Sequence, residues 1–246
     1  MTLLQKIRDL YQKIPTSVKL GFVGASIVYT TFKGIEFIDE NPSIQHAHSQ
    51  INEYELLVED KRPTLRGLYS DKSVSELVNM VETAEDARDY CIYYLESESD
   101  NNNYGVVDYM ASLKQIHEKQ LDDCDGGSVA ALELLRDDYH MNLLIMYFEG
   151  GGGHMVAVYK DKDLYGTIGI NEVDYNEARF EDYDGILDYF EDIHKDIRDV
   201  YVVSSSVLDD EKLLESEEDL STLIKGKAVD YESFLRTKAF FENQEG

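Results

Sequence analysis

Three short apolar runs in the second half of the chain restrict its fold more than any other feature. They are Asn142–Phe148, Met155–Lys160 and Leu164–Ile170, and the segments between them read EGGGG and KDKD. Apolar runs of this length that end in glycine-rich or charged turns predict strands joined as hairpins. A later run, Val200–Val207, predicts a further strand. The sequence therefore predicts an antiparallel sheet.

Helical spacing surrounds these strands. Ser73 and Glu76 have the spacing of a capping box ahead of a helix that reaches about Glu82. A second helix is predicted from Cys124 to Asp137, with Gly126 and Gly127 in its first turns. Further helices are predicted over 84–96, 106–119, 184–198, 209–224 and 228–242. Helices followed by a group of antiparallel strands predict an α+β fold.

The charge of the chain excludes some functions. Asp and Glu number 50 and Lys and Arg number 23, so the formal net charge is −27. A surface this acidic repels phosphate backbones, which excludes a general nucleic-acid binder. Two cysteines cannot supply a disulfide framework, so the fold depends on its core. No sequence feature fixes the oligomeric state.

A basic leader, residues 1–38, precedes the acidic body. It contains an uncharged run, Leu20–Phe32, that spans about 20 Å as a helix, short of the roughly 30 Å hydrocarbon core of a bilayer. A buried or interfacial helix and a short signal anchor both fit this run. Membrane contact through residues 1–38 and a cytoplasmic or membrane-associated location therefore stay open.

We divide the chain into four regions on this pattern. The leader covers 1–38, a helical and linker region 39–104, a mixed core 105–207 and acidic helices 208–246.

Cys124 begins a predicted helix, where free amide groups and the helix dipole favour a thiolate and an oxyanion. Its neighbouring aspartates oppose a thiolate, so a cationic partner is needed. His154 follows the glycine run directly and opens a strand. Asn171 lies late in the next strand, where antiparallel pairing would place it beside His154, and Asp174 is the reserve candidate. A thiol, an imidazole and an orienting group are the parts of a nucleophilic triad.

These segments, DDCDGGSVAALELLRD, GGGGHMVAVYK and LYGTIGINEVDY, resemble the transglutaminase-like, papain-related cysteine hydrolases, in particular the bacterial transglutaminase-like cysteine proteinases. The resemblance covers about residues 105–205. It implies a cysteine-bearing helix packed on an antiparallel sheet, with extra helices at both ends. By this resemblance Cys124 is the nucleophile, His154 the general base and acid, and Asn171 the orienter. Gln120 and Gln115 are candidate oxyanion donors.

The function expected from these residues is thiol-dependent hydrolysis or acyl transfer at amide bonds of a protein or peptide, with no cofactor. The alternative is an inactive module of the same fold that binds a basic partner. We expect no metal site, because the segment around Asp123–Gly126 lacks both ends of a calcium loop. Structural or solvated roles are expected for three single histidines and a sheet-surface role for Ser204–Ser206; the histidines are His117, His140 and His194.

Overall fold

The computed structural model describes residues 61–106, 109–194 and 196–242. For residues 210 and 238–242 it describes the backbone alone. Within this part of the chain, six strands form one antiparallel sheet in the order β6-β5-β4-β3-β7-β8. Its strands are β3 (His140–Phe148), β4 (Gly153–Asp161), β5 (Leu164–Ile168), β6 (Asn176–Phe180), β7 (Ile197–Ser204) and β8 (Val229–Asp230). Two further strands, β1 (Glu96–Ser97) and β2 (Leu121–Asp122), pair in parallel as a separate small sheet.

Helices cover both faces of the large sheet. Residues 61–69 are helical, and the elements before β3 are α5 (Val74–Met80), α6 (Ala84–Arg88), the π-helix η1 (Asp89–Tyr94), α7 (Asp100–Asn103), α8 (Leu113–Lys119) and α9 (Cys124–Leu135). After β5 come two 3₁₀ turns and four helices: η2 (Glu172–Asp174), α10 (Tyr183–His194), η3 (Ser205–Val207), α11 (Asp210–Glu215), α12 (Ser221–Lys227) and α13 (Tyr231–Glu242).

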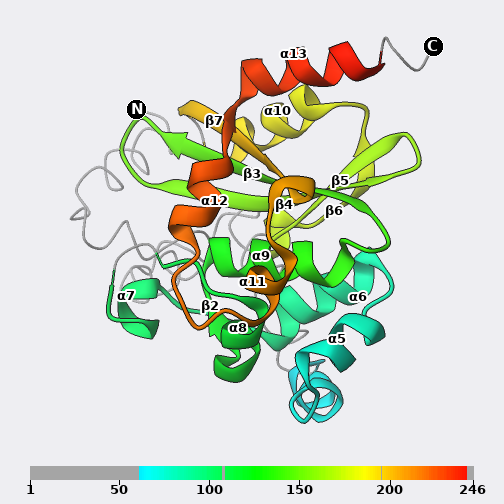
Figure 1. Cartoon of the computed structure of the whole chain (residues 1–246), viewed down its shortest axis with the longest axis vertical. Coiled ribbons are helices and arrows are strands. Elements are labelled where there is room, and N and C mark those ends of the chain that lie inside the picture. Colours follow the sequence, from blue (N-terminus) through cyan, green and yellow to red (C-terminus); the bar gives the residue numbers. More distant parts are fainter. Residues whose placement is uncertain (1–60, 107–108, 195, 243–246) are drawn as a thin grey trace, which may run out of the picture. The chain divides into compact units, whose positions relative to one another are not determined.

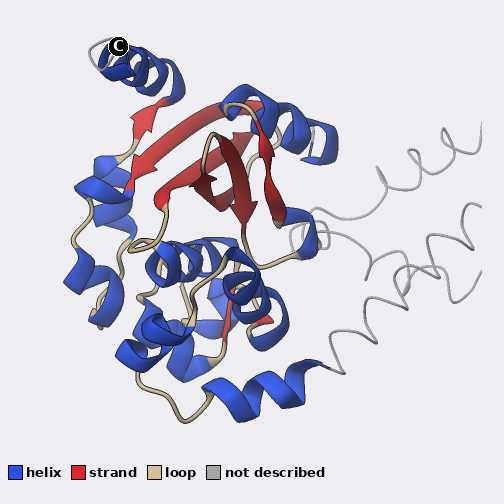
Figure 2. Ribbon diagram, turned by 90° about the vertical axis from the view of Figure 1, so that its right-hand side faces the viewer, coloured by secondary structure: helices blue, strands red, loops and turns tan. Residues whose placement is uncertain are grey.

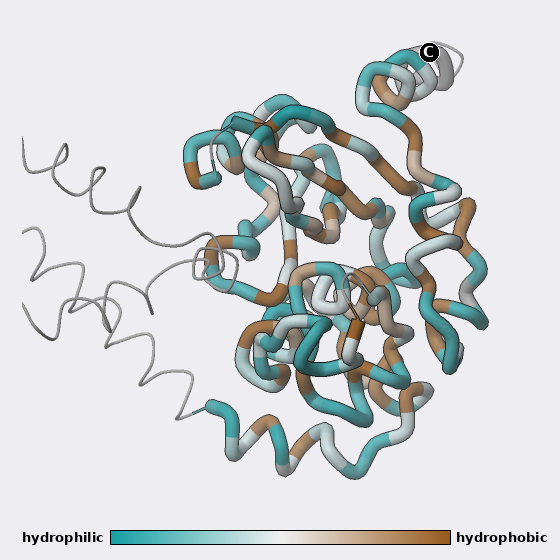
Figure 3. Tube along the Cα trace, turned by 90° about the vertical axis from the view of Figure 1, so that its left-hand side faces the viewer, coloured by the Kyte–Doolittle hydropathy of each residue, from teal (hydrophilic) through white to brown (hydrophobic). Residues whose placement is uncertain are grey.

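Figures 1 and 2 show the layers: α9 and the other helices that precede β3 lie on one side of the sheet, and α10 and α13 lie on the other. In Figure 3 hydrophobic stretches run along the strands, while the turns and outer helices are largely polar. The mixed composition and antiparallel pairing agree with the predicted α+β class.

Glycine lets α9 approach the sheet closely. A Cβ atom on Gly127 would lie 2.8 Å from Cβ of Ile170 and 3.1 Å from its backbone nitrogen. One residue further on, the Ser128 hydroxyl donates a hydrogen bond of 2.9 Å to the carbonyl of Met155 in β4. The first turn of α9 is thus held against the start of β4 and the chain that follows β5.

The opposite face of the sheet packs against α10. Met146 of β3 and Val156 of β4 share a buried cluster with Ile186 and Phe190 of α10. His154 lies opposite Met146 in the β3–β4 register, so its side chain leaves the sheet on this same face. Its ring centroid lies 5.9 Å from that of Phe190.

Several local predictions are confirmed. Ser73 accepts a hydrogen bond from the backbone of Glu76, whose carboxylate accepts from the backbone of Ser73, as the capping box requires. The three apolar runs form β3, β4 and β5. The long helix predicted over 84–96 is instead α6 followed by the π-helix η1.

Other boundaries were wrong. The helix predicted over 106–119 begins only at Leu113. Before it, the backbone N–H groups of Tyr109 and Met110 donate to the carboxylates of Asp100 and Asp219, so tertiary contacts hold this segment extended. The predicted helix over 209–224 is two helices, α11 and α12, and β6 was not predicted.

The leader, residues 1–38, with its apolar run Leu20–Phe32, lies outside the described residues. Among the helices that are described, none is long and apolar enough to cross a bilayer.

We predict that Gly127→Ala destabilises the protein by about 1–3 kcal/mol, because the added methyl group forces α9 away from Ile170. Urea denaturation measures the change. Gly150→Ala is the matched control: its Cβ would meet nothing within 4 Å, and we expect a change within about 0.5 kcal/mol. Equal effects of the two substitutions would contradict the close approach.

Candidate functional site

A buried histidine–carboxylate pair lies at the start of β4. Nε2 of His154 is 2.7 Å from Oδ1 of Asp174, and the two side chains are 3% and 0% exposed. A carboxylate bonded to one ring nitrogen fixes the orientation of an imidazole and the position of its proton. The other nitrogen, Nδ1, is thereby left as the one that can exchange a proton with a reacting group.

Asp174 reaches His154 because β5 ends early. The strand stops at Ile168, and a turn through Gly169 leads into η2, which carries Asp174 back toward the sheet. A Cβ on Gly169 would lie 2.8 Å from the Asp174 side chain, so this turn requires glycine. Asn171, expected as the orienter, donates from its backbone and its side-chain amide to Oδ2 of Asp174, at 3.0 and 3.2 Å. Asn171 therefore contacts the Asp174 carboxylate, and that carboxylate contacts the imidazole of His154.

Cys124 is the first residue of α9, as its sequence position predicts, and is only partly exposed. Burial and the charges of Asp125, Asp123 and Asp174 raise the pKa of its thiol well above the ordinary value. A hydrogen bond from the backbone of Met155 lowers the pKa, but it is the weaker influence. The resting side chain is therefore a neutral thiol.

The sulfur lies close to the peptide bond that links His154 to Met155. The backbone nitrogen of Met155 is bonded directly to the carbonyl carbon of His154, so a thiol that contacts this N–H is near the backbone of His154, whose imidazole packs on Phe190 of α10. β5 leaves this N–H accessible, because its pairing with β4 starts only at Ala157. Within the described part of the chain, however, no hydrogen bond joins the Cys124 sulfur to the imidazole.

The two glutamines proposed as oxyanion donors are engaged elsewhere. The Gln115 amide donates to the Tyr109 hydroxyl at 2.9 Å, and its carbonyl caps the first turn of α8. The Gln120 amide lies 3.5 Å from the hydroxyl of Ser70. The first amides of α9 are also occupied, since Asp125 and Gly126 donate to the carboxylates of Asp123 and Asp125.

A second histidine, His194, lies behind His154 at the end of α10. The two ring centroids are 4.8 Å apart, and the His194 ring also packs on Phe148 and Phe190. Nε2 of His194 is buried, and the described part of the chain offers it no hydrogen-bond partner. Burial and the neighbouring His154 lower its pKa to about 4, so His194 is neutral at physiological pH. His194 follows Phe190 by four residues on a predicted amphipathic helix. This spacing was the signal that could have predicted that both rings lie on the same face of the helix.

Four carboxylates gather near the start of α9, the helix that begins at Cys124. The side chains of Asp100, Asp122, Asp123 and Asp125 each have an oxygen within 4.8 Å of the others. Burial raises the pKa of Asp122 to about 7, and burial and a bond with Asp123 raise that of Asp125 well above its usual range. Of the residues described, these four are the group close enough to hold a metal ion, and their oxygens are donors of the type that hard divalent cations take.

No family model matches the sequence, and a search of curated proteins finds no match. A solved structure described as "Crystal structure of a TGase" is similar in part, at 13% sequence identity and a TM-score of 0.29. The matched region covers 62% of this chain and 39% of that one, so the chain spans about two fifths of the length of the protein it matches. A likeness this weak carries no argument about activity.

We predict that Asp122→Asn stabilises the protein at pH 8 and not at pH 4. The folded-state pKa of Asp122, about 7, exceeds its ordinary value of 3.8, so the carboxylate charge destabilises the fold increasingly as pH rises from about 4 to 7. The asparagine removes this charge. At about 1.4 kcal/mol for each unit of pKa shift, we expect a gain on the order of 1–3 kcal/mol at pH 8, measured by thermal unfolding.

Asp138→Asn is the control for Asp122→Asn, because it removes the same charge from an exposed position. A gain of the same size in both variants would mean that overall repulsion, and not the buried carboxylate, limits stability.

In acid, the His194→Phe variant should be more stable than the unsubstituted protein. The pKa of His194 is lowered to about 4 from 6.5, so the unfolded chain binds more protons between these values, and stability is lost as pH falls through this window. Phenylalanine keeps the ring stacking and cannot take up a proton. We expect its advantage in melting temperature to grow between pH 6.5 and pH 4, whereas His140→Gln, at an exposed histidine, should show no such trend.

Proposed function

We propose that this chain is a thiol-dependent acyl-transfer protein that acts on amide bonds of a protein or peptide, with a transglutaminase-like or papain-like core. Cys124 is the nucleophile, His154 the general base and acid, and Asp174 the group that orients the imidazole. The observation that carries the proposal is the buried 2.7 Å pair of His154 and Asp174, whose carboxylate is close enough to Cys124 to raise the pKa of its thiol. No cofactor is required for this chemistry.

The neutral thiol determines the order of the proton transfers. Nδ1 of His154 takes the proton of the Cys124 thiol as the sulfur attacks the substrate carbonyl carbon. The tetrahedral intermediate then collapses to a thioester, and the imidazolium returns the proton to the departing amine. Water or a second amine attacks the thioester, giving hydrolysis or transamidation, and the thiol is restored. The Asp174 carboxylate stabilises the transient imidazolium.

The oxyanion of this intermediate needs donors at the start of α9. The Asp125 and Gly126 amides are bonded to aspartate side chains in the resting protein. Substrate must therefore displace these carboxylates, and the raised pKa of Asp125 favours its protonation instead of repulsion once an anion forms nearby.

The second candidate is a binding module without catalysis. Two observations favour it: the pKa of Cys124 is raised by three aspartates, and the described residues show no bond between its sulfur and the imidazole. Its ligand would be a basic protein attracted by the formal charge of −27.

The pH dependence of Cys124 alkylation by iodoacetamide distinguishes the two candidates. Cys91→Ala serves as the background; Cys91 is fully buried and burial raises the pKa of its thiol, so its removal takes away only a slow competing reaction. Because the thiol is neutral at rest, an acyl-transfer centre should be alkylated at pH 7 with His154 as the general base, and His154→Ala should remove this reactivity. Asp174→Asn should lower the rate at pH 7 by about tenfold or more.

Asn171→Ala is the matched control for Asp174→Asn, because it removes a partner of the carboxylate but leaves the carboxylate on the imidazole. We expect its rate to stay within about threefold of the background protein. If Cys124 is unreactive, or titrates as an ordinary thiol with and without His154, the binding module is the correct description.

A further inference from the structure

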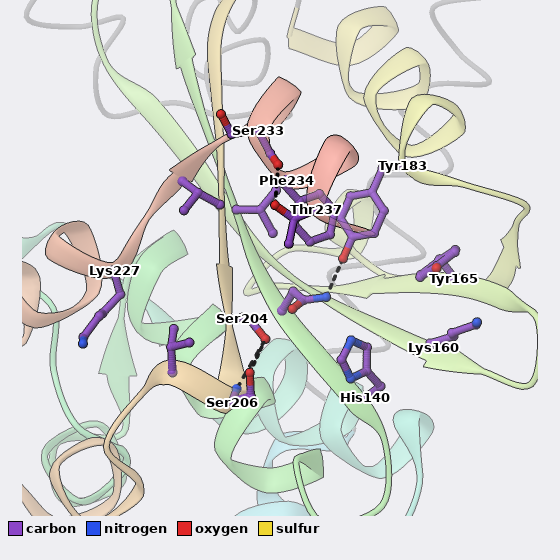
Figure 4. A pocket seen from close by; sticks show the side chains of 14 residues that line it. His140, Lys160, Tyr165, Tyr183, Ser204, Ser206, Lys227, Ser233, Phe234 and Thr237 are labelled. Atoms are coloured by element: carbon purple, nitrogen blue, oxygen red, sulfur yellow. Dashed lines mark hydrogen bonds between the residues drawn. The ribbon is translucent and has the colours of Figure 1, made fainter. Parts of the chain in front are cut away.

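A cavity of about 800 Å³ opens on the face of the sheet opposite α9, a volume typical of small-molecule sites. It lies between β3, β4, β7 and the helices α10 and α13, with an apolar wall that includes Val202, Tyr183 and Phe234 (Figure 4). None of the catalytic candidates lines it. Whatever it binds is therefore separate from the proposed acyl-transfer site.

The charge of the cavity is opposite to that of the protein. Asp and Glu make up 50 of the 246 residues, yet the described residues that line the cavity include none of them. They include Lys160, Lys227 and His140. Figure 4 shows Lys227 on one side and Lys160 with His140 on the other. Neither lysine has an ion-pair partner among the residues described, and the Lys160 ammonium lies 5.6 Å from the centre of the Tyr165 ring, so the cavity keeps a net positive charge.

Lys160 and His140 are positioned to bind one anion together. They are direct cross-strand partners in the β3–β4 register, and side chains in such pairs lie on the same face with Cβ atoms about 5 Å apart. The Lys160 ammonium and a ring N–H of His140 can both donate to one acceptor between them. A carboxylate or phosphate is such an acceptor.

An unsatisfied amide lies two residues along β3. Asn142 is 2% exposed and lines the cavity; its NH₂ group donates to the Tyr183 hydroxyl at 2.7 Å, while its oxygen is buried and has no hydrogen-bond partner among the residues described. Buried polar atoms rarely lack a hydrogen-bond partner, so we expect a ligand to donate a hydrogen bond to this oxygen. Side chains two residues apart on one strand are about 7 Å apart, which sets the distance between donor and anion in that ligand.

We propose that this cavity binds an amphipathic organic anion. Its carboxylate or phosphate head lies between Lys160 and His140, its hydrocarbon body lies against Val202 and Phe234, and a hydroxyl about 7 Å from the head donates to Asn142. The apolar wall excludes a fully hydrated polar ligand, and the unpaired lysines exclude a cation.

The chain contains no tryptophan, so Phe234→Trp introduces a single reporter in the wall of the cavity. Titration of this variant with decanoate should shift its emission to shorter wavelength and saturate at micromolar to low millimolar concentration. Decanol should bind at least tenfold more weakly, and decylamine more weakly still. Isothermal titration calorimetry of the unsubstituted protein provides the same affinities if Phe234→Trp is poorly folded.

Lys160→Ala should weaken decanoate binding about tenfold and leave decanol unchanged. Lys212→Ala removes the same charge from α11, outside the cavity lining, and should leave both unchanged. 6-Hydroxydecanoate, whose hydroxyl lies about 7 Å from the carboxylate in an extended chain, should bind at least threefold more tightly than decanoate, and equal affinities would remove Asn142 from the site. Equal binding of decanoate and decylamine, an unaltered affinity in Lys160→Ala, or no saturable binding would overturn the proposal.

Discussion

The close contact between the first turn of α9 and the start of β4 is the constraint on which the candidate site depends. Gly127 has no side chain and so admits the backbone of Ile170, and Ser128 bonds the carbonyl of Met155. These contacts fix where Cys124 lies relative to His154. Because α9 also fills one side of the sheet, the position of the thiol and the stability of the core depend on the same few atoms.

The site combines features that favour and oppose catalysis. The bond to Asp174 orients the imidazole of His154, whereas burial and the aspartates around Cys124 hold the thiol in its neutral form. Both follow from placing a helix start beside a strand start in a chain rich in carboxylates. A substrate that covers the aspartates, or that carries positive charge, would change this balance toward the thiolate.

Local patterns in the sequence predicted what depends on neighbouring residues, such as the capping box at Ser73 and the three strands around the glycine run. The residue that contacts His154 was named from the sequence only as the reserve candidate. Antiparallel register placed Asn171 beside His154, but β5 ends at Ile168 and the turn at Gly169 brings Asp174 there instead. The late start of α8 has the same kind of cause, because distant Asp219 bonds the backbone of Met110. The cavity between β3 and α13 joins segments almost a hundred residues apart and has no local signature; Ser204 and Ser206, expected on an open sheet surface, line it.

The two edge strands of the large sheet affect whether the protein aggregates at high concentration. β8 has two residues, and β6 has five, with a register shift against β5. Short or irregular outer strands offer few free backbone groups in line, so another chain finds little to pair with. Together with strong mutual repulsion between acidic molecules, these strands disfavour the edge-to-edge stacking that starts fibrils.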